Sequence, residues 1–445
     1  MADITALDYI LLPFYLIIIY KIAFYYRDKY YPLNHPFRNY FIPGLTVKIA
    51  GSLFIAFIYG YYYGDGDTFN FFTHAQIINN TLIDSPDTWW RLITHRADIN
   101  NPEDMVIVQD LWWYDDISSY TTSCLGAIIG LFCFTKYIEI NVITASIVFI
   151  GMWLMFVRFA SQYSNTKLIA LAILFMPGPA VWGSGLFKDS FCIFSVGCLV
   201  YSFYILFERK KLKAGLLILS VISIIIIILV KAYILVALVP VLIFKVLLEY
   251  RKRIRGNFIK KLVFYTVLLI AGFGIYKGMA VSVDALSKYN TENVLNVVKT
   301  QKDYLLSTNT NEGSFYNLGD FEPTIQGVSK LILPAINVTL FRPYPWEAKS
   351  VIQYLNMAES SATLLLTLYV IFTINPLVIL KYIYQDSNLI MCLIFTMIFA
   401  FFVGISSYNF GALSRYKIPV TPFYITFIAI LISKSNEEKI IKKQV

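Results

Sequence analysis

Charged residues are scarce in this sequence. Asp, Glu, Lys and Arg together make up 15% of its 445 residues, whereas 58% of the residues are hydrophobic. Soluble domains carry roughly 25% charged residues, and a soluble core of this size needs far less apolar surface. The scarcity of charge therefore excludes a soluble globular fold.

Patterns that bind metals or form disulfide frameworks are also missing. The three histidines and five cysteines include no CxxC pair and no Cys/His cluster. The sequence contains no P-loop or paired-glycine fingerprint, and its serines fit no nucleophile elbow. The cysteines are interpreted as small residues that face lipid or the core: Cys124, Cys133, Cys192, Cys198 and Cys392.

The sequence does contain many apolar runs close to the roughly 20 residues that cross a hydrocarbon core as a helix. The runs are continuous, which excludes the alternating pattern of an outer-membrane barrel. We predict an all-α, polytopic transmembrane bundle of about 11–12 spans, forming one transmembrane domain over residues 1–445. The predicted spans are 6–26, 44–63, 118–135, 139–160, 166–182, 188–207, 214–230, 232–249, 260–279, 361–381, 388–406 and 416–433.

Loop charges predict the orientation of these spans. Lys and Arg gather in short loops such as 209–213 and 251–261, which marks those loops as cytoplasmic. The first long polar stretch, 64–117, is acidic, so it and the second long stretch, 280–360, are expected on the outer side. The net charge of +9 is thereby explained by membrane orientation, and no nucleic-acid partner is expected.

The number of spans conflicts with this orientation. An odd number of crossings must separate the outer stretch 64–117 from the cytoplasmic loop 209–213, yet four candidate spans lie between them. One candidate must therefore fail to cross. The run 166–182 is the weakest, because Pro177, Gly178 and Pro179 break its end. The run 139–160 is the other suspect.

The most informative polar segment runs from Tyr63 to Phe72, Tyr-Gly-Asp-Gly-Asp-Thr-Phe-Asn-Phe-Phe. Asp65 and Asp67 follow the outer end of a span, and the glycine between them allows a turn that points both to one place. Such a carboxylate can take a proton from a sugar hydroxyl. Two carboxylates can also hold a divalent ion, Mg²⁺ or Mn²⁺, against a diphosphate. The simpler interpretation is a polar turn with solvated acids.

The residues after this turn have the pattern of an amphipathic helix. Thr68 is expected to cap a helix that runs to about Ile83 along the membrane interface. His74 lies on this helix and is interpreted as a surface histidine.

Two further segments place cations at predicted outer ends of spans. The breaker-rich stretch Pro177 to Ser190 leads into a span that opens with Lys188 and Asp189, and Lys231 and Tyr233 lie in a tight hairpin. Cations on the outer side run against the positive-inside rule, so both lysines are candidates for binding a lipid phosphate. The alternatives are a self-satisfied Lys-Asp pair and lysines that snorkel to the surface.

The segment Leu340 to Glu347, Leu-Phe-Arg-Pro-Tyr-Pro-Trp-Glu, lies late in the second outer stretch. Arg342 can grip a phosphate through its planar fork, and Glu347 can pair with that arginine. Tyr344 and Trp346 suit either the face of a sugar or the membrane interface. The simpler interpretation is an interfacial anchor with a structural ion pair.

Arg415 and Lys417 open the last predicted span, again on the outer side. With Lys188, Lys231 and Arg342 they would place several cations on the side of the acidic pair. An anionic head group requires such an arrangement.

This layout resembles the GT-C superfamily of membrane glycosyltransferases. The resemblance lies in Gly64-Asp65-Gly66-Asp67 with the aromatics Phe69 to Phe72, in the Lys188-Asp189 span start after proline, and in the outer-side Lys231. Arg342 to Glu347 and Arg415 to Pro419 look like segments of uncharacterised membrane proteins encoded with bacterial exopolysaccharide genes.

The resemblance implies a GT-C-like fold and a polyprenyl-phosphate- or diphosphate-linked sugar donor. It also implies a glycan acceptor and transfer on the outer face of a bacterial inner membrane. Asp65 or Asp67 would be the base or the metal-side carboxylate, and Arg342, Lys231 and Arg415 would hold the lipid phosphate.

We therefore predict an inverting glycosyltransferase of surface polysaccharide or glycoconjugate synthesis. Alternatives are a polysaccharide polymerase of the same fold and a noncatalytic subunit of a larger assembly. A transporter or flippase of lipid-linked glycans is a third, and it would predict charges at span midplanes and an internal repeat.

Overall fold

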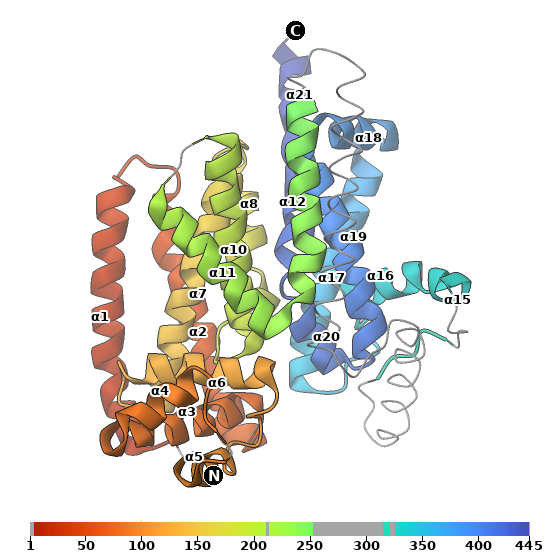
Figure 1. The fold of residues 1–445 in the computed structure, drawn as a ribbon. Coiled ribbons are helices and arrows are strands. Elements are labelled where there is room, and N and C mark those ends of the chain that lie inside the picture. Colours follow the sequence, from red (N-terminus) through yellow and green to blue (C-terminus); the bar gives the residue numbers. More distant parts are fainter. Residues whose placement is uncertain (1–3, 99, 211–212, 252–314, 320–324, 445) are drawn as a thin grey trace. The chain divides into compact units, whose positions relative to one another are not determined.

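The computed structural model describes residues 4–98, 100–210, 213–251, 315–319 and 325–444. These residues form helices joined by turns, and their only extended pairing is one isolated bridge between Phe315 and Asn409. The predicted all-α fold is confirmed for this part of the chain (Figure 1). The predicted span 260–279 lies outside the described residues.

Seven of the described helices are long and apolar enough to cross a membrane, and one bent pair gives an eighth. The chain is therefore a multi-pass membrane protein, and its described part has fewer spans than the about 11–12 predicted for the whole chain. The seven are Ala6–Tyr30, Arg38–Tyr63, Tyr137–Ala160, Lys188–Glu208, Ala214–Lys231, Gln353–Thr373 and Ser387–Ser407.

The chain divides into two compact units. Unit 1 comprises Met1–Arg158, Pro179–Ser202 and Ala214–Lys231, and unit 2 comprises Phe159–Gly178, Phe203–Lys213 and Ala232–Val445. The helices wholly or mostly in unit 1 are α1 (Ala6–Tyr30), α2 (Arg38–Phe57) with its π-helical end η1 (Ile58–Tyr63), α3 (Asp67–Asp84), α4 (Pro86–Ile93), α5 (Pro102–Val108), α6 (Ile117–Gly130), α7 (Tyr137–Ala160), α9 (Pro177–Val181), α10 (Lys188–Phe203) and α11 (Ala214–Lys231).

The described helices of unit 2 begin with α8 (Thr166–Leu174), η2 (Tyr204–Glu208) and α12 (Tyr233–Arg251). They continue with α15 (Ile325–Lys330), α16 (Ile332–Phe341), α17 (Val351–Thr373), α18 (Pro376–Gln385), α19 (Ser387–Ser407), α20 (Phe410–Tyr416) and α21 (Thr421–Gln444).

The predicted helix after the acidic turn is confirmed as α3, although its start differs. Gly64 and Gly66 adopt φ angles of 69° and 136°, which only glycine adopts readily, and Gly66 precedes the first helical residue, Asp67. Thr68 is therefore inside the helix and not its cap. Its buried hydroxyl accepts a hydrogen bond from Tyr137 (3.3 Å).

The predicted span 118–135 does not cross. Its residues form α6, a 14-residue helix whose first half is polar, Ile-Ser-Ser-Tyr-Thr-Thr-Ser. Asp116, just before α6, pairs with Lys188 at the start of α10 (3.5 Å). After α6 the chain enters α7, whose Asn141 accepts a hydrogen bond from the backbone of Leu186 (2.8 Å), again beside the start of α10. Both ends of α6 thus lie at one end of unit 1.

Helices α7 and α10, on either side of the run 166–182, are both long and apolar enough to cross a membrane. The run 166–182 is interrupted as predicted, between α8 and α9. The run 139–160 forms α7, which is long and apolar enough to cross a membrane. The run 118–135 forms no such helix, because the first half of α6 is polar.

The interrupted stretch before α10 is buried in unit 1 and takes its hydrogen bonds from side chains. The buried ammonium of Lys48, in the middle of α2, donates to the carbonyls of Pro179 (2.7 Å) and Gly183 (2.6 Å). Gly51, one turn along α2, lies so close to the Ala180 carbonyl that a Cβ would overlap it. A broken backbone is tolerated at membrane depth where protein satisfies it in this way.

Two predicted spans of unit 2 have different limits. The run 361–381 is divided between α17 and α18, because Pro376 cannot continue a helix and Asn375 caps the next one (2.9 Å to the Leu377 N–H). The run 416–433 belongs to α20 and α21, which meet at 65°. The short apolar helix α16 forms inside the predicted outer stretch 280–360. Helices α12 and α19 match the runs 232–249 and 388–406.

The packing of α7 against α10 yields the first prediction. A Cβ at Gly197 would overlap the carbonyl of Gly151, so glycine lets the two helices approach closely. We expect Gly197→Ala to lower the melting temperature of the detergent-solubilised protein by several degrees. Gly215→Ala is the control, because a Cβ there meets nothing within 4 Å. Equal melting temperatures for both variants would contradict the described packing.

Candidate functional site

The acidic turn lies where the sequence places it, directly after the end of α2 and η1. Asp65 is exposed, and its carboxylate accepts a hydrogen bond from the N–H of Gly66 (2.5 Å). Asp67 is half-buried as the first residue of α3. An acidic residue in the first turn of a helix interacts favourably with the positive end of the helix dipole.

Lys188 connects this turn to the start of α6. Its ammonium lies 3.5 Å from the carboxylate of Asp116 and within electrostatic range of Asp67 and Lys231. Asp116 also caps α6, because its carboxylate accepts a hydrogen bond from the Ser118 N–H (3.2 Å). Asp116 is not among the predicted site residues, although an Asp two residues before Ser118 is a helix-start signal.

Lys231, the last residue of α11, pairs with Asp189. The alternative that Lys188 and Asp189 pair with each other is therefore not what the structure has. The Lys231 Nζ lies 2.5 Å from the Asp189 carboxylate, and the two side chains are 9% and 6% exposed. The Ser118 hydroxyl donates to the carbonyl of Val230 (2.7 Å), which fastens α6 to the end of α11. Burial makes this pair sensitive to the loss of either partner.

Four of the predicted residues therefore come together in unit 1, with one addition. We call this set the charge cluster: Asp67, Asp116, Lys188, Asp189 and Lys231. Helices α3, α6 and α10 begin at it, so their positive dipole ends add to the two ammonium groups. Burial raises the pKa of Asp116, but the Ser119 hydroxyl and the Lys188 ammonium outweigh burial and hold it below its usual range.

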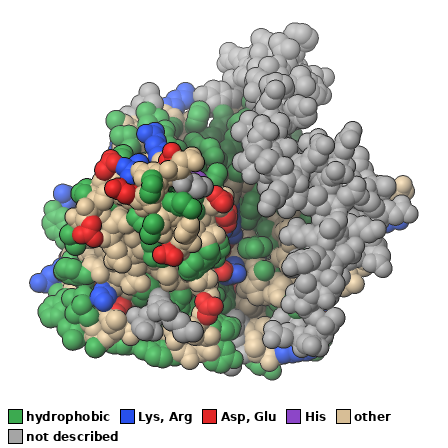
Figure 2. Space-filling model, turned by 60° about the horizontal axis from the view of Figure 1, so that its bottom comes forward, with side chains coloured by type: hydrophobic (Ala, Val, Ile, Leu, Met, Phe, Trp, Pro, Cys, Tyr) green, Lys and Arg blue, Asp and Glu red, His purple; other side chains and the backbone are tan. Residues whose placement is uncertain are grey.

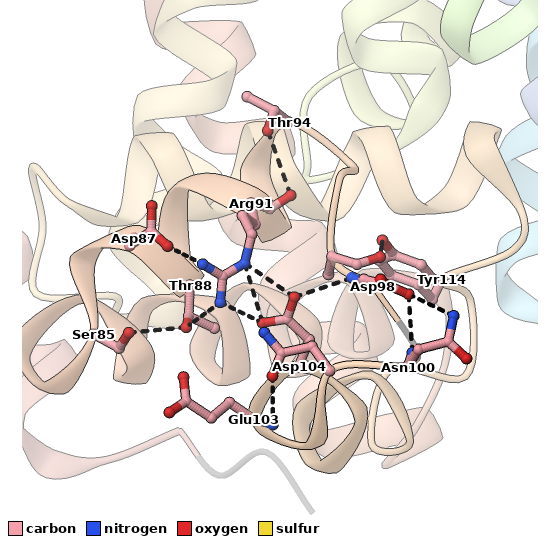
Figure 3. Close-up of polar contacts among 12 residues, drawn as sticks. Ser85, Asp87, Thr88, Arg91, Thr94, Asp98, Asn100, Glu103, Asp104 and Tyr114 are labelled. Carbon is pink, nitrogen blue, oxygen red and sulfur yellow. Dashed lines mark hydrogen bonds and ion pairs between the residues drawn. The ribbon is translucent and has the colours of Figure 1, made fainter.

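The acids of the stretch 64–117 have two kinds of surroundings. Figure 2 views this end and shows acidic side chains spread between hydrophobic ones. Asp104 is the buried exception and bonds Arg91 through both carboxylate oxygens (2.7 and 3.0 Å; Figure 3). Arg91 also reaches Asp87 and Thr88, and Asp104 accepts the Asp98 N–H (3.0 Å). This network fixes α4 on α5 beside α3.

His74 is not the surface residue that the sequence suggested. It is fully buried in α3, with its ring against Trp112 (4.3 Å between centroids) and Trp113 (5.5 Å). Burial lowers the pKa of His74 to about 4, so the imidazole is neutral at physiological pH. Its role is packing of the layer that carries Asp67.

The remaining predicted residues belong to unit 2. Arg342 bonds Glu347 through Nε (3.0 Å to each carboxylate oxygen) and also through Nη2, so much of its fork is occupied. Burial raises the pKa of Glu347, but Arg342 and the Tyr344 N–H outweigh it and lower the pKa. Tyr344 stacks on Trp346 (5.0 Å, 29°).

Lys417 lies inside unit 2 rather than at its surface. It is buried at the bend between α20 and α21, donates to the Ser360 hydroxyl (2.9 Å) and lies 3.9 Å from Glu359. Arg415 is half-buried in α20, and Tyr233 stacks on Phe399 (5.9 Å). Glu359 and Ser360 were not singled out in the sequence, since they lie at the end of the predicted outer stretch 280–360, just before the predicted span 361–381.

The acidic turn offers a metal ion two carboxylates, those of Asp65 and Asp67. Among the described residues, no group of three or more His, Cys, Asp or Glu side chains could hold a metal ion. The exposed Asp65 and the half-buried Asp67 have no third such ligand beside them. Mg²⁺ is commonly held by one or two carboxylates together with waters and substrate phosphates, so two carboxylates suit an ion that binds with a diphosphate.

The Arg91–Asp104 network yields the second prediction. Arg91 holds the pKa of Asp104 below its usual range, so the pair stabilises the fold above about pH 4 and is lost as the pH falls further. We expect Asp104→Asn to lower the melting temperature at pH 7 and to reduce the drop between pH 7 and pH 3. The exposed Asp110→Asn is the control. An unchanged pH profile in Asp104→Asn would refute the structural role of this pair.

Comparison of the chain with models of protein families, with curated proteins and with solved structures gave no match.

Proposed function

We propose that this protein is a glycosyltransferase that transfers a sugar from a polyprenyl-phosphate or polyprenyl-diphosphate carrier to a glycan acceptor. In this proposal it acts at the outer face of a bacterial inner membrane, in surface polysaccharide or glycoconjugate synthesis. The charge cluster of unit 1 carries the proposal. It combines three carboxylates, two ammonium groups and three helix N-termini at one end of a membrane-embedded unit.

The chemistry requires a base and a stabilised leaving group. Asp67 takes the proton of an acceptor hydroxyl as its oxygen attacks the anomeric carbon of the donor sugar. The bond from that carbon to the carrier phosphate breaks, and its electron pair remains on the phosphate oxygen. The Lys188 ammonium and the N-termini of α3 and α10 stabilise this negative charge. A single displacement of this kind inverts the anomeric centre.

The other members of the charge cluster act as positioning residues. Asp116 holds Lys188 at the start of α10, and Asp189 holds Lys231 at the end of α11. These ion pairs do not prevent the two lysines from binding a phosphate. An ammonium group has three N–H donors, so it can bond an aspartate and a doubly charged phosphate at the same time. Arg342 and Arg415 of unit 2 remain candidates for a lipid phosphate, whereas the burial of Lys417 favours an internal role.

A lipid-linked glycan transporter is the second candidate. Buried ionisable groups inside spans mark ion or substrate pathways, and Glu359 and Lys417 form such a pair in unit 2. A cavity of about 10 Å³ adjoins the pair and is lined by the hydroxyls of Thr339, Thr363 and Tyr424 among others. A polysaccharide polymerase is a variant of the first proposal, with a lipid-linked glycan as donor.

The third prediction tests catalysis at Asp67 in the native host. We expect Asp67→Asn, at normal membrane levels, to abolish the surface glycan and to accumulate its lipid-linked donor or acceptor, since the amide cannot accept the proton. Asp110→Asn, an exposed acid of the same stretch, should leave the glycan profile unchanged. A normal glycan in Asp67→Asn and in the Asp65→Asn, Asp67→Asn double variant would exclude the enzyme. Loss of glycan in Glu359→Gln but not in Asp67→Asn would favour the transporter.

A further inference from the structure

The loop Arg342–Glu347 of unit 2 presents an aromatic pair to the outside. Trp346 is 78% exposed, although its ring stacks on that of Tyr344 with centroids 5.0 Å apart. The loop joins the apolar helix α16 to the span α17, so it lies outside the helices that cross the membrane. We call this loop the aromatic loop.

Glu347 organises the aromatic loop from its inside. Its carboxylate accepts three hydrogen bonds from Arg342 and one from the Tyr344 N–H (2.8 Å), which closes the loop on itself. The Arg342 guanidinium lies 5.9 Å from the centre of the Tyr344 ring and 5.8 Å from that of Tyr316.

Two further contacts tie the aromatic loop to neighbouring helices. The Tyr344 hydroxyl bonds the side-chain amide of Asn337 on α16 (3.1 Å), and the Ser360 hydroxyl of α17 donates to the Arg342 carbonyl (2.9 Å). The ring of Tyr344 is therefore fixed by its hydroxyl, its backbone and its neighbours before any ligand arrives.

This rigidity separates the two uses of an exposed Trp-Tyr pair. An interfacial anchor sits in a fluid region and gains little from a fixed ring geometry. A stacking site for a ring-shaped ligand gains affinity when its aromatic face is pre-organised, because binding then costs less ordering. The exposed side-chain amide of Asn337 also lies beside the Tyr344 ring, where a sugar hydroxyl can bond it.

We propose that the Tyr344–Trp346 pair is a carbohydrate-binding platform that stacks against the apolar face of a sugar ring. That this sugar belongs to the glycan acceptor rests on the proposed function; the sugar-binding site itself does not. Trp346 supplies the stacking surface, and Glu347 acts as a positioning residue that holds the aromatic loop in its binding shape.

The test uses the full chain in phosphatidylcholine nanodiscs. Cellohexaose, maltohexaose, chitohexaose and mannohexaose are titrated while saturation-transfer NMR records sugar binding.

We expect at least one probe to bind. Trp346→Ala should weaken that binding about tenfold, as expected for the loss of one stacking contact, and Trp346→Phe should weaken it less. Glu347→Gln should also weaken the binding, although glutamine has the same size as the glutamate that it replaces. Tyr354→Ala, an exposed tyrosine of α17, is the control and should have no effect.

Three results would overturn the platform. These are no binding of any probe, equal binding by Trp346→Ala, and quenching of Trp346 by brominated lipid without sensitivity to sugar, which would identify a membrane anchor. The Asp67→Asn variant keeps the two proposals apart. It should bind sugar normally, so a failure of catalysis at Asp67 would leave the sugar-binding result unaffected.

Discussion

Backbone groups in an apolar phase need protein partners, and this constraint is strongest where the chain is interrupted before α10. Lys48 donates to two carbonyls of that stretch, and the Glu359 carboxylate accepts the N–H of Gly178. These contacts satisfy the backbone of the broken segment that leads into α10. Helix α10 begins at the same end of unit 1 as α3, and Lys188 lies within electrostatic range of Asp67. The proposed chemistry depends on this placement of Lys188.

The charge cluster and the aromatic loop share one feature: in each, an ion pair holds a residue that we propose to contact a ligand. In unit 1 Asp116 holds Lys188, and in unit 2 Glu347 holds Arg342 and the backbone of Tyr344. Ion pairs at the surface contribute little to stability. Their value here is geometric, since a charged partner fixes a flexible side chain whose position decides what can bind.

Composition and loop charge predicted a helical membrane protein and the shared placement of Asp67, Lys188 and Lys231. This was possible because the length of an apolar run and the charge of a loop can each be read from a short stretch of sequence. The failure at 118–135 has a physical cause, since α6 is apolar enough to resemble a span but too short and too polar at its start. Lys48 was missed because the partners of a single charge in an apolar run, here the carbonyls of Pro179 and Gly183, lie far away in the sequence. Glu359 was missed because it lies at the end of the predicted outer stretch 280–360, whereas in the structure it belongs to a span.

Lys188 and Asp189 are neighbours in the sequence, yet one bonds the start of α6 and the other the end of α11. This crossed arrangement constrains how the chain can diverge in evolution. A change of charge at position 189 demands a compensating change at position 231, and a change at 188 demands one at 116. The adjacent positions 188 and 189 are thereby coupled to two different positions far away in the sequence, 116 and 231. Related sequences should show that coupling as paired replacements, inherited independently of each other.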